Sequence, residues 1–187
     1  TPDGADVAIG HATTPFVTAY AWSSGFGTKY SDPSTLPAGT GNGVRFSPDG
    51  ADFIIAHATS PCVSAYPWSS GFGTKYSNPG SSSGTTGNDV DFAPDGADVA
   101  IANNVSPYTR AYPWSSGFGS KYSDPGTLPA GNGNGIRFLP SGDDIVIAHA
   151  TTPFVTAYAW SSGFGSKYSN PATLPAGTGN AIGIKYV

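Results

Sequence analysis

The chain has 187 residues, of which 38% are hydrophobic, 13% aromatic and 11% charged, so it can build a core with few surface charges. Its net charge of −4 and pI near 5.0 argue against a nucleic-acid partner, and no apolar run approaches the roughly 18 residues of a membrane span. Glu, Gln and Met are absent, whereas Gly (26) and Pro (17) are abundant. Because the missing residues favour helices and the abundant ones break them, the composition predicts an all-β fold.

One unit of 46 residues occurs four times in the chain. Its clearest marker is a tryptophan within A-Y-[AP]-W-S-S-G-F-G-[ST]-K-Y-S-[DN]-P, found as Trp22, Trp68, Trp114 and Trp160. The four units span residues 1–46, 47–92, 93–138 and 139–184, and we expect them to form a single domain at 1–187. Repeats of this length are typical of propellers and solenoids.

The second unit shows the expected elements in chain order. Alternating and continuous apolar runs predict four short strands, at residues 43–46, 52–57, 62–68 and 73–76. A tight turn, Ser47-Pro48-Asp49-Gly50, follows the first strand, and the second strand is apolar on both faces, as in a strand covered on both sides. Four antiparallel strands with a long crossover describe one blade of a β-propeller, and so the chain is expected to contain four such blades.

The phase of the repeat predicts how the ring closes. Residues 1–4 align with the turn at 47–50, and the C-terminal segment 181–184 aligns with the first strand of a unit. We therefore expect this segment to pair with the strand holding Val7 and Ile9, which would close the ring through a shared strand. Either one chain closes a four-bladed ring or two chains form an eight-bladed homodimer; the size of the unit favours the dimer, and both stay open.

The S-P-D-G turn, the apolar strand after it and the aromatic strand that ends in Trp resemble the WD-repeat propeller family. The likeness covers the whole chain and is greatest to the highly repetitive bacterial and phage members. The chain departs from that pattern where Ser69 follows Trp68 in place of Asp, and where Asn42 follows Gly41 in place of His. The resemblance implies the fold, but the partner-binding roles of the family do not carry over with it.

Some aromatic positions are candidates for contact with a ligand or partner. A phenylalanine sits between glycines on the same turn of every unit, where a large ring either packs or is exposed for binding. The third unit departs from its siblings at a second group of candidate positions. The candidate contact residues are Phe26, Phe72, Phe118, Phe164, Asn103, Tyr108 and Arg110. The tyrosines two residues before each Trp are instead expected to pack between blades.

Two other patterns suggest metals without predicting them. His11, His57 and His149 share one repeat position, but no Asp, Glu or Cys accompanies them at ligand spacing, so we expect each to satisfy a buried backbone group or to line a channel. The aspartates of the P-D-G turns, with a second Asp three residues later, hint at calcium, but Asp before Gly is what a tight turn favours. No metal and no cofactor is predicted.

Catalytic chemistry has little support in the sequence. No Ser-His-Asp order recurs, Glu is absent and the single thiol, Cys62, replaces a core-like Phe, so no catalytic residue is predicted. The expected function is a non-catalytic binding or structural scaffold that mediates protein interaction or self-association. The alternative is a multivalent carbohydrate-binding propeller with one aromatic site per blade. The chain opens at Thr1 without Met, so processing from a longer protein and the compartment both stay open.

Overall fold

The computed structural model of the chain describes residues 1–80 and 86–185, which contain no helix and form four antiparallel sheets. The first sheet consists of β1 (Asp6–Gly10), β2 (Val17–Trp22) and β3 (Phe26–Lys29). The second consists of β4 (Gly41–Phe46), β5 (Asp52–His57) and β6 (Val63–Pro67), and the third of β7 (Gly87–Phe92), β8 (Asp98–Asn103) and β9 (Thr109–Pro113). The fourth consists of β10 (Gly133–Phe138), β11 (Asp144–His149), β12 (Val155–Trp160) and β13 (Phe164–Lys167). The predicted all-β, propeller-like arrangement is confirmed.

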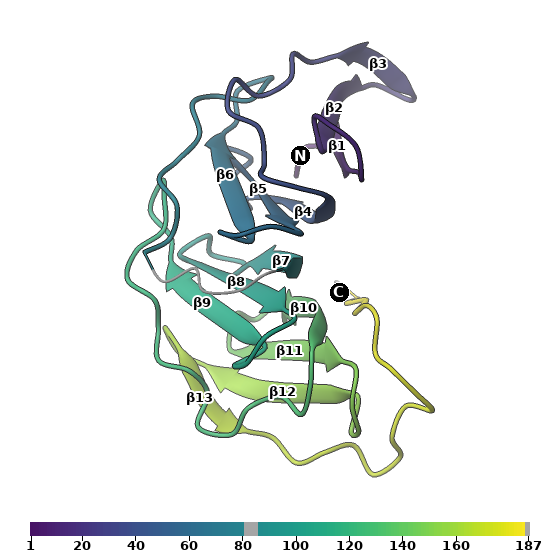
Figure 1. The fold of residues 1–187 in the computed structure, drawn as a ribbon, viewed down its shortest axis with the longest axis vertical. Helices are drawn as coiled ribbons and strands as arrows, with labels where there is room; N and C mark the ends of the chain where they lie inside the picture. The colour runs from purple at the N-terminus through teal and green to yellow at the C-terminus, as the bar shows by residue number, and fades with distance from the viewer. Residues whose placement is uncertain (81–85, 186–187) are drawn as a thin grey trace.

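The four sheets follow one another along an open arc (Figure 1). The second, third and fourth sheets each take their first strand from the end of the preceding 46-residue unit. Strands β4, β7 and β10 contact one another in sequence along the concave side of the arc, and are therefore the innermost strands. The first sheet begins instead with β1, the equivalent of β5, and has no innermost strand of its own among the described residues. The described part of the chain contains no helix long and apolar enough to cross a membrane.

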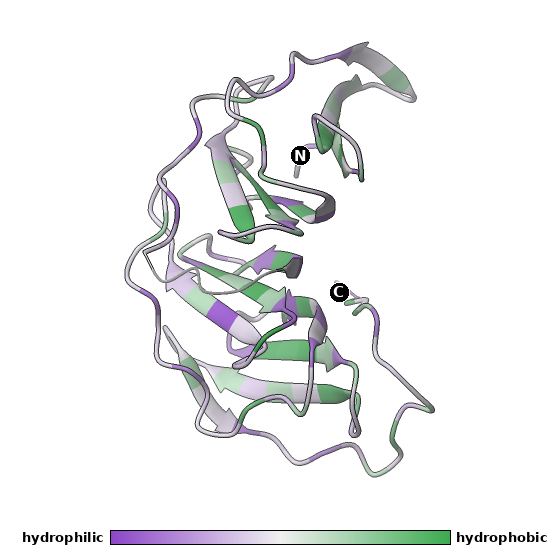
Figure 2. Ribbon diagram, viewed as in Figure 1, coloured by the Kyte–Doolittle hydropathy of each residue, from purple (hydrophilic) through white to green (hydrophobic). Residues whose placement is uncertain are grey.

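The core lies between neighbouring sheets. Every residue of β5 and β8 is buried, and Figure 2 shows hydrophobic residues along these second strands. Alternate side chains of β5 enter different clusters: Ile54 packs with residues of the third sheet, and Ile55 packs with Val17 and Ala19 of the first. The prediction that the second strand is covered on both faces is thus confirmed.

The P-D-G aspartates hold tight turns. Asp49 Oδ1 accepts a hydrogen bond from the Ala51 amide at 3.0 Å, and Gly50 has a φ of 74° that favours glycine. The equivalent bonds from the Ala5 and Ala97 amides are 3.1 and 2.9 Å long. The turn interpretation of this position is therefore confirmed.

A carboxylate bridge joins each blade to the next one. Asp52 Oδ1 accepts a hydrogen bond from the Tyr76 hydroxyl of its own blade at 2.7 Å, while Oδ2 accepts from Trp114 Nε1 of the following blade at 2.9 Å. The Trp114 ring stands edge-on to Tyr76 with centroids 5.6 Å apart. The same bridge recurs at the two other junctions, through Asp6 with Tyr30 and Trp68, and Asp98 with Tyr122 and Trp160.

The expectation of four strands in every blade holds only for the fourth sheet: the first sheet has no innermost strand, and the two middle sheets have no outer strand among the described residues. There the predicted outer strand is reduced to an isolated bridge, between Trp68 and Phe72 and between Trp114 and Phe118. The strand facing that position carries Pro67 in the second unit, and Ala21 in the first unit where β3 forms. Because proline has no N–H to donate, it removes a rung of the ladder at this position.

Among the residues that the structure describes, the expected pairing of the C-terminal segment with the strand that holds Val7 and Ile9 does not form within one chain, so the four-bladed alternative is wrong and the homodimer stays a prediction. The segment at 179–184 lies beside β10, where Asn134 Nδ2 donates to the Gly179 carbonyl at 2.9 Å, and Figure 1 shows it apart from β1. In the described residues β1 pairs with β2 alone, so its other edge stays open. Because closure depends on the angle accumulated over all blades, local sequence patterns could not settle it.

Removal of a bridging carboxylate should destabilise the fold. We expect Asp52→Ala to lower the free energy of unfolding by about 2–4 kcal/mol, because it removes two hydrogen bonds to a charged group and leaves a buried indole N–H unpaired. Urea unfolding followed by tryptophan fluorescence measures the change. The control Asp32→Ala removes only an exposed ion pair with Lys29 and should change stability by less than about 0.5 kcal/mol. Equal effects of the two variants would contradict the role of the bridge.

Candidate functional site

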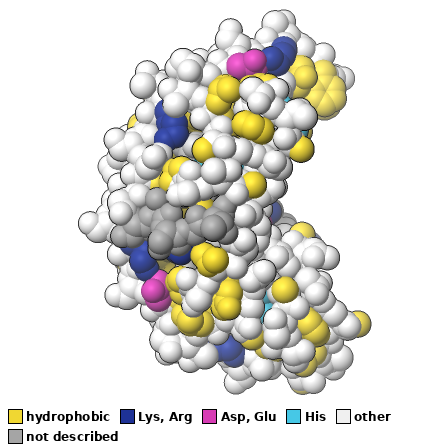
Figure 3. All heavy atoms as spheres, in the orientation of Figure 1, with side chains coloured by type: hydrophobic (Ala, Val, Ile, Leu, Met, Phe, Trp, Pro, Cys, Tyr) yellow, Lys and Arg dark blue, Asp and Glu magenta, His cyan; other side chains and the backbone are white. Residues whose placement is uncertain are grey.

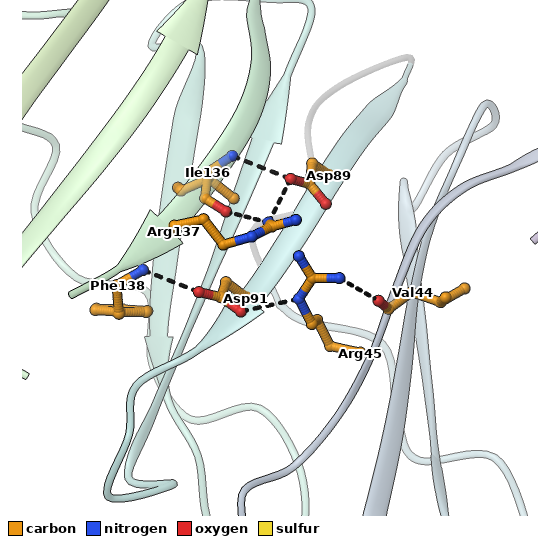
Figure 4. Close-up of polar contacts among 7 residues, drawn as sticks. All are labelled: Val44, Arg45, Asp89, Asp91, Ile136, Arg137 and Phe138. Carbon is orange, nitrogen blue, oxygen red and sulfur yellow. Dashed lines mark hydrogen bonds and ion pairs between the residues drawn. The ribbon is translucent and has the colours of Figure 1, made fainter. Parts of the chain in front are cut away.

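Four charged side chains gather on the concave face of the arc, between the innermost strands. Arg45 comes from β4, Asp89 and Asp91 from β7, and Arg137 from β10 (Figure 4). Asp89 and Asp91 point to the same face because side chains two apart on a strand share a face. The strands thus bring together charges that are 46 to 48 residues apart in the chain.

Each aspartate joins an arginine to a backbone amide of β10. Arg45 Nε donates to Asp91 Oδ1 at 3.0 Å, and Asp91 Oδ2 accepts from the Phe138 amide at 2.9 Å. Arg137 Nη1 donates to Asp89 Oδ2 at 2.6 Å, and the Ile136 amide donates to the same oxygen at 3.1 Å. The aspartates therefore satisfy N–H groups on the inner edge of β10, which lies at the concave face of the arc.

Burial dominates the titration of this cluster. It raises the pKa of Asp91 to about 6, against the opposing effects of the Phe138 amide and the Arg45 guanidinium, and the neighbouring charge of Asp89 adds to the rise. A carboxyl with a pKa near neutrality can exchange a proton at physiological pH, which is what a general base requires. Perturbed groups of this kind cluster at functional sites, although structural ion pairs also show them.

A cavity of about 550 Å³ opens beside the cluster. Arg45 and Asp91 supply its charged wall, while the inner-strand phenylalanines and the prolines of the tight turns supply its apolar wall. A mostly apolar pocket with a few convergent polar groups is the usual form of a small-molecule site. The lining residues are Pro2, Arg45, Phe46, Ser47, Pro48, Asp91, Phe92, Pro94, Phe138 and Pro140.

The predicted phenylalanine contacts lie far from this cavity, on the outer turns. Phe72, Phe118 and Phe164 are half-buried and stand edge-on to the Trp of their own blade, with centroids 5.0–5.1 Å apart. Phe118 and Phe164 also line shallow inter-blade grooves of about 370 and 280 Å³. Phe26 differs because 66% of it is exposed. Their role as contacts stays a prediction.

The structure buries two of the three candidates of the third unit. Asn103 and Arg110 are 0% and 5% exposed, and the Asn103 Oδ1 accepts from the Val105 amide at 3.2 Å. Tyr108 is half-buried with a φ of 68°, in the turn where Phe16, Cys62 and Phe154 have the same backbone. Contact with a partner at these three positions also remains a prediction.

The tyrosines are packed as expected, whereas the histidines contact side-chain hydroxyls where backbone groups were expected. Nε2 of His57 lies 3.1 Å from the Ser64 hydroxyl, and burial lowers the pKa of His57 to about 4. Tyr66 is fully buried and donates its hydroxyl hydrogen to the Thr35 carbonyl at 2.8 Å. In the described part of the chain, no three or more His, Cys, Asp or Glu side chains gather to hold a metal.

Sequence reasoning missed the pairing at the candidate site. Arg45, Asp91 and Arg137 stand at one repeat position, and this variation among otherwise constant units was the available signal. Asp89 gave a second signal, because the equivalent positions hold Gly43 and Gly135. An alignment of the four units places these charges on one face, but it does not tell which pairs form.

No family model matches the sequence, and no curated protein matches it. Solved structures do match in fold. The chain superposes on a structure named "putative 6-phosphogluconolactonase" from Bacteroides uniformis with a TM-score of 0.60 at 14% identity, covering 81% of this chain and 46% of that one. A protein of the same name from Bacteroides fragilis gives 0.59 at 13% identity, with 91% and 44% covered. Hydrazine synthase from Kuenenia stuttgartiensis gives 0.66 at 14% identity, with 85% and 44% covered.

These likenesses establish the fold, and the chain spans less than half the length of each structure. They overturn the expectation of a non-catalytic scaffold, and of its lectin alternative, because structures with this arrangement carry the names of enzymes. The lack of a visible catalytic motif was therefore no ground for excluding catalysis. The resemblance to WD repeats stays a prediction, since none of these names includes it.

The Asp91 carboxyl should titrate near pH 6, about two units above an exposed Asp. Removal of the neighbouring cation by Arg45→Ala should raise this pKa further. Because the folded pKa is above the unfolded one, Asp91 stabilises the fold fully below about pH 4, and that stabilisation is lost as the pH rises through about 6. A carboxyl ¹³C NMR titration measures the pKa, and a midpoint of Asp91 near 4 would contradict the assignment.

Proposed function

We propose that the cavity beside Arg45 and Asp91 binds a small anionic ester or lactone and hydrolyses it. One observation carries the proposal: a carboxyl with a pKa near 6 and a guanidinium line the same 550 Å³ cavity, 3.0 Å from each other. The carboxyl can take a proton from water, and the guanidinium can hold an anion. Together, the Asp91 carboxyl and the Arg45 guanidinium can support hydrolysis of a charged substrate.

Arg45 is placed to bind the anionic end of the substrate. Its Nε and Nη1 donate to Asp91 and to the Val44 carbonyl, which fix the plane of the guanidinium. Because a guanidinium carries five N–H donors, it can keep these bonds and still donate to a phosphate or carboxylate in the cavity. About a third of the side chain is exposed, so a ligand can reach it.

Asp91 would act as the general base. Above pH 6 its carboxylate takes a proton from a water molecule, whose oxygen forms a bond to the carbonyl carbon of the ester. The ring or ester C–O bond then breaks, and the proton passes from Asp91 to the leaving oxygen. Atoms and charge balance without any cofactor, and the apolar wall formed by Phe46, Phe92 and Phe138 limits competing water.

The comparisons supply the first substrate class to test. The two Bacteroides structures carry the name of an enzyme that acts on a phosphorylated sugar lactone. Such a lactone combines a phosphate for Arg45 with an ester carbonyl for the water that Asp91 activates. It is also small enough for the cavity, because ligand pockets of drug-sized molecules are about 300–1,000 Å³.

The proposal is tested by adding 6-phosphogluconolactone to the purified chain. The rate of hydrolysis above the spontaneous rate is measured between pH 5 and 8. We expect the rate to rise with pH through a midpoint near 6, as Asp91 ionises. Asp91→Asn should lower kcat by about 100-fold or more, which is typical of a lost general base. Arg45→Ala should mainly raise KM, by about tenfold or more, because it removes a charge-assisted hydrogen bond.

Asp124→Asn is the matched control, since it makes the same chemical change at an exposed ion pair with Lys121. It should leave both kcat and KM unchanged. A wild-type rate no greater than the spontaneous one, for this lactone and for its unphosphorylated analogue, would overturn the proposal. If the wild-type chain is active and the Asp91→Asn variant has the same kcat, the assignment of Asp91 as the base is wrong.

A further inference from the structure

Neighbouring blades of the chain meet at the same kind of junction three times. The first blade carries one half of a further junction of this kind, and the fourth blade carries the other half. At each internal junction, the Trp of one blade donates to the bridging Asp of the preceding blade and packs edge-on against its Tyr. These tryptophans are 6–7% exposed. Trp22 of the first blade has the same place in its repeat but is 40% exposed, because its side of the junction faces solvent.

The fourth blade carries the other half of this junction. Asp144 Oδ1 accepts from the Tyr168 hydroxyl at 2.7 Å, as in the other bridges, but in the described residues no Trp donates to Asp144. Tyr168 is 49% exposed, whereas Tyr76 and Tyr122 are half-buried against a Trp of the next blade. The Asp144 carboxylate and the Tyr168 ring, which would contact Trp22 in such a junction, are therefore both present and uncovered.

The segment at 179–184 occupies the position of an innermost strand next to the fourth sheet. Gly179 N donates to the His149 carbonyl at 3.1 Å, as Gly41 N does to the His11 carbonyl, also at 3.1 Å. The Gly179 carbonyl accepts from Asn134 at 2.9 Å, matching the bonds of 2.8 and 2.7 Å at the two preceding junctions. The first sheet lacks just such a strand on the open edge of β1.

The surfaces of the two ends support the same conclusion. Figure 3 shows hydrophobic side chains at the end of the crescent formed by the first sheet, and the exposed large hydrophobic residues there are Ile9, Trp22 and Phe26. Ile9 is 40% exposed, while its equivalents Ile55 and Ile147 are fully buried under a neighbouring strand or blade. Uncovered apolar residues on an open sheet edge are a template for another strand.

We propose that a second copy of this chain completes the ring, with each copy inserting its segment 179–184 against β1 of the other. The pairing of β4 with β5 fixes the register by repeat equivalence: Ala181 opposite Gly10, Ile182 opposite Ile9, and Ile184 opposite Val7. Trp22 of one copy donates to Asp144 of the partner and stands against the partner's Tyr168. Two identical head-to-tail contacts then close an eight-bladed ring with no free sheet edge.

A second copy is favoured over closure by the chain itself because the two halves of the junction stand at opposite ends of the arc (Figure 1). A head-to-tail contact of this kind either closes or continues into a filament, depending on the rotation per subunit. The open arc seen here, with the concave faces of the blades turned inward, lets two copies face each other and close. The inference does not rest on the proposed hydrolysis.

The primary test is the native mass of the protein, measured by light scattering at concentrations from about 2 to about 100 µM, where an interface with a micromolar dissociation constant would dissociate in part. We expect a mass of about twice the 19.0 kDa of the chain at the upper concentrations. Trp22→Ala should raise the dissociation constant by about tenfold or more, because a buried Trp is a frequent hot spot of interfaces. Leu36→Ala is the matched control, since Leu36 is similarly exposed at 37% but lies outside the proposed contact.

Disulfide trapping then tests the register. In a Cys62→Ser background, a mixture of the single variants Ile9→Cys and Ile182→Cys should form a covalent dimer on mild oxidation, because directly opposed residues lie within disulfide range. Gly183→Cys in place of Ile182→Cys should not, because the next residue points to the other face of the strand. A single-chain mass at all concentrations, a mass above two chains, or equal trapping by both mixtures would overturn the inference.

Discussion

The carboxylate that joins an indole of one blade to a phenol of the blade before it fixes the geometry of the whole molecule. Asp52 accepts both hydrogen bonds at the junction of two sheets, where most of the surrounding side chains make nondirectional apolar contacts. Because a hydrogen bond is directional, this bridge sets both the distance and the rotation between neighbouring blades. Repetition of one junction then gives the chain a regular curvature, and the concave face that holds the candidate site follows from it.

Much of this fold could be predicted from the sequence, since its determinants are local. The tight turn at 47–50, the doubly buried strand β5 and the packed tyrosines each follow from residue type and spacing within one unit. The bridge was missed because Asp52 looks like a second turn residue, and its partner Trp114 lies 62 residues away. The sequence left closure by one chain and closure by two chains both open, because closure depends on a rotation summed over four blades, which no single unit encodes.

The candidate site is built from repeat positions that vary, unlike the junctions between blades. The residues that build the junctions are constant among the units, whereas the inner-strand position changes from Arg45 to Asp91 to Arg137. This alternation of sign allows each charge to find its opposite on the neighbouring strand, and it places Asp91 where burial raises its pKa to about 6. The repeat thus supplies a rigid frame on which a few positions were free to acquire chemistry. The cost of burying these charges is offset by pairing and by backbone amides.

The constant spacing of the bridge also bears on how the chain folds. Each carboxylate contacts an indole 62 residues further on, in the adjacent unit, so the contacts between blades join nearest neighbours in sequence. Such an array behaves as a linear chain of coupled units, in which order spreads from one unit to the next as the polypeptide emerges from the ribosome. Cooperativity is then weakest at a unit that contacts only one neighbour: in the described residues the strand β1 is only partly buried, while its equivalent β5 is fully buried. In a single copy that has no partner, the first blade is therefore the unit whose amides exchange fastest with solvent while the remaining blades stay folded.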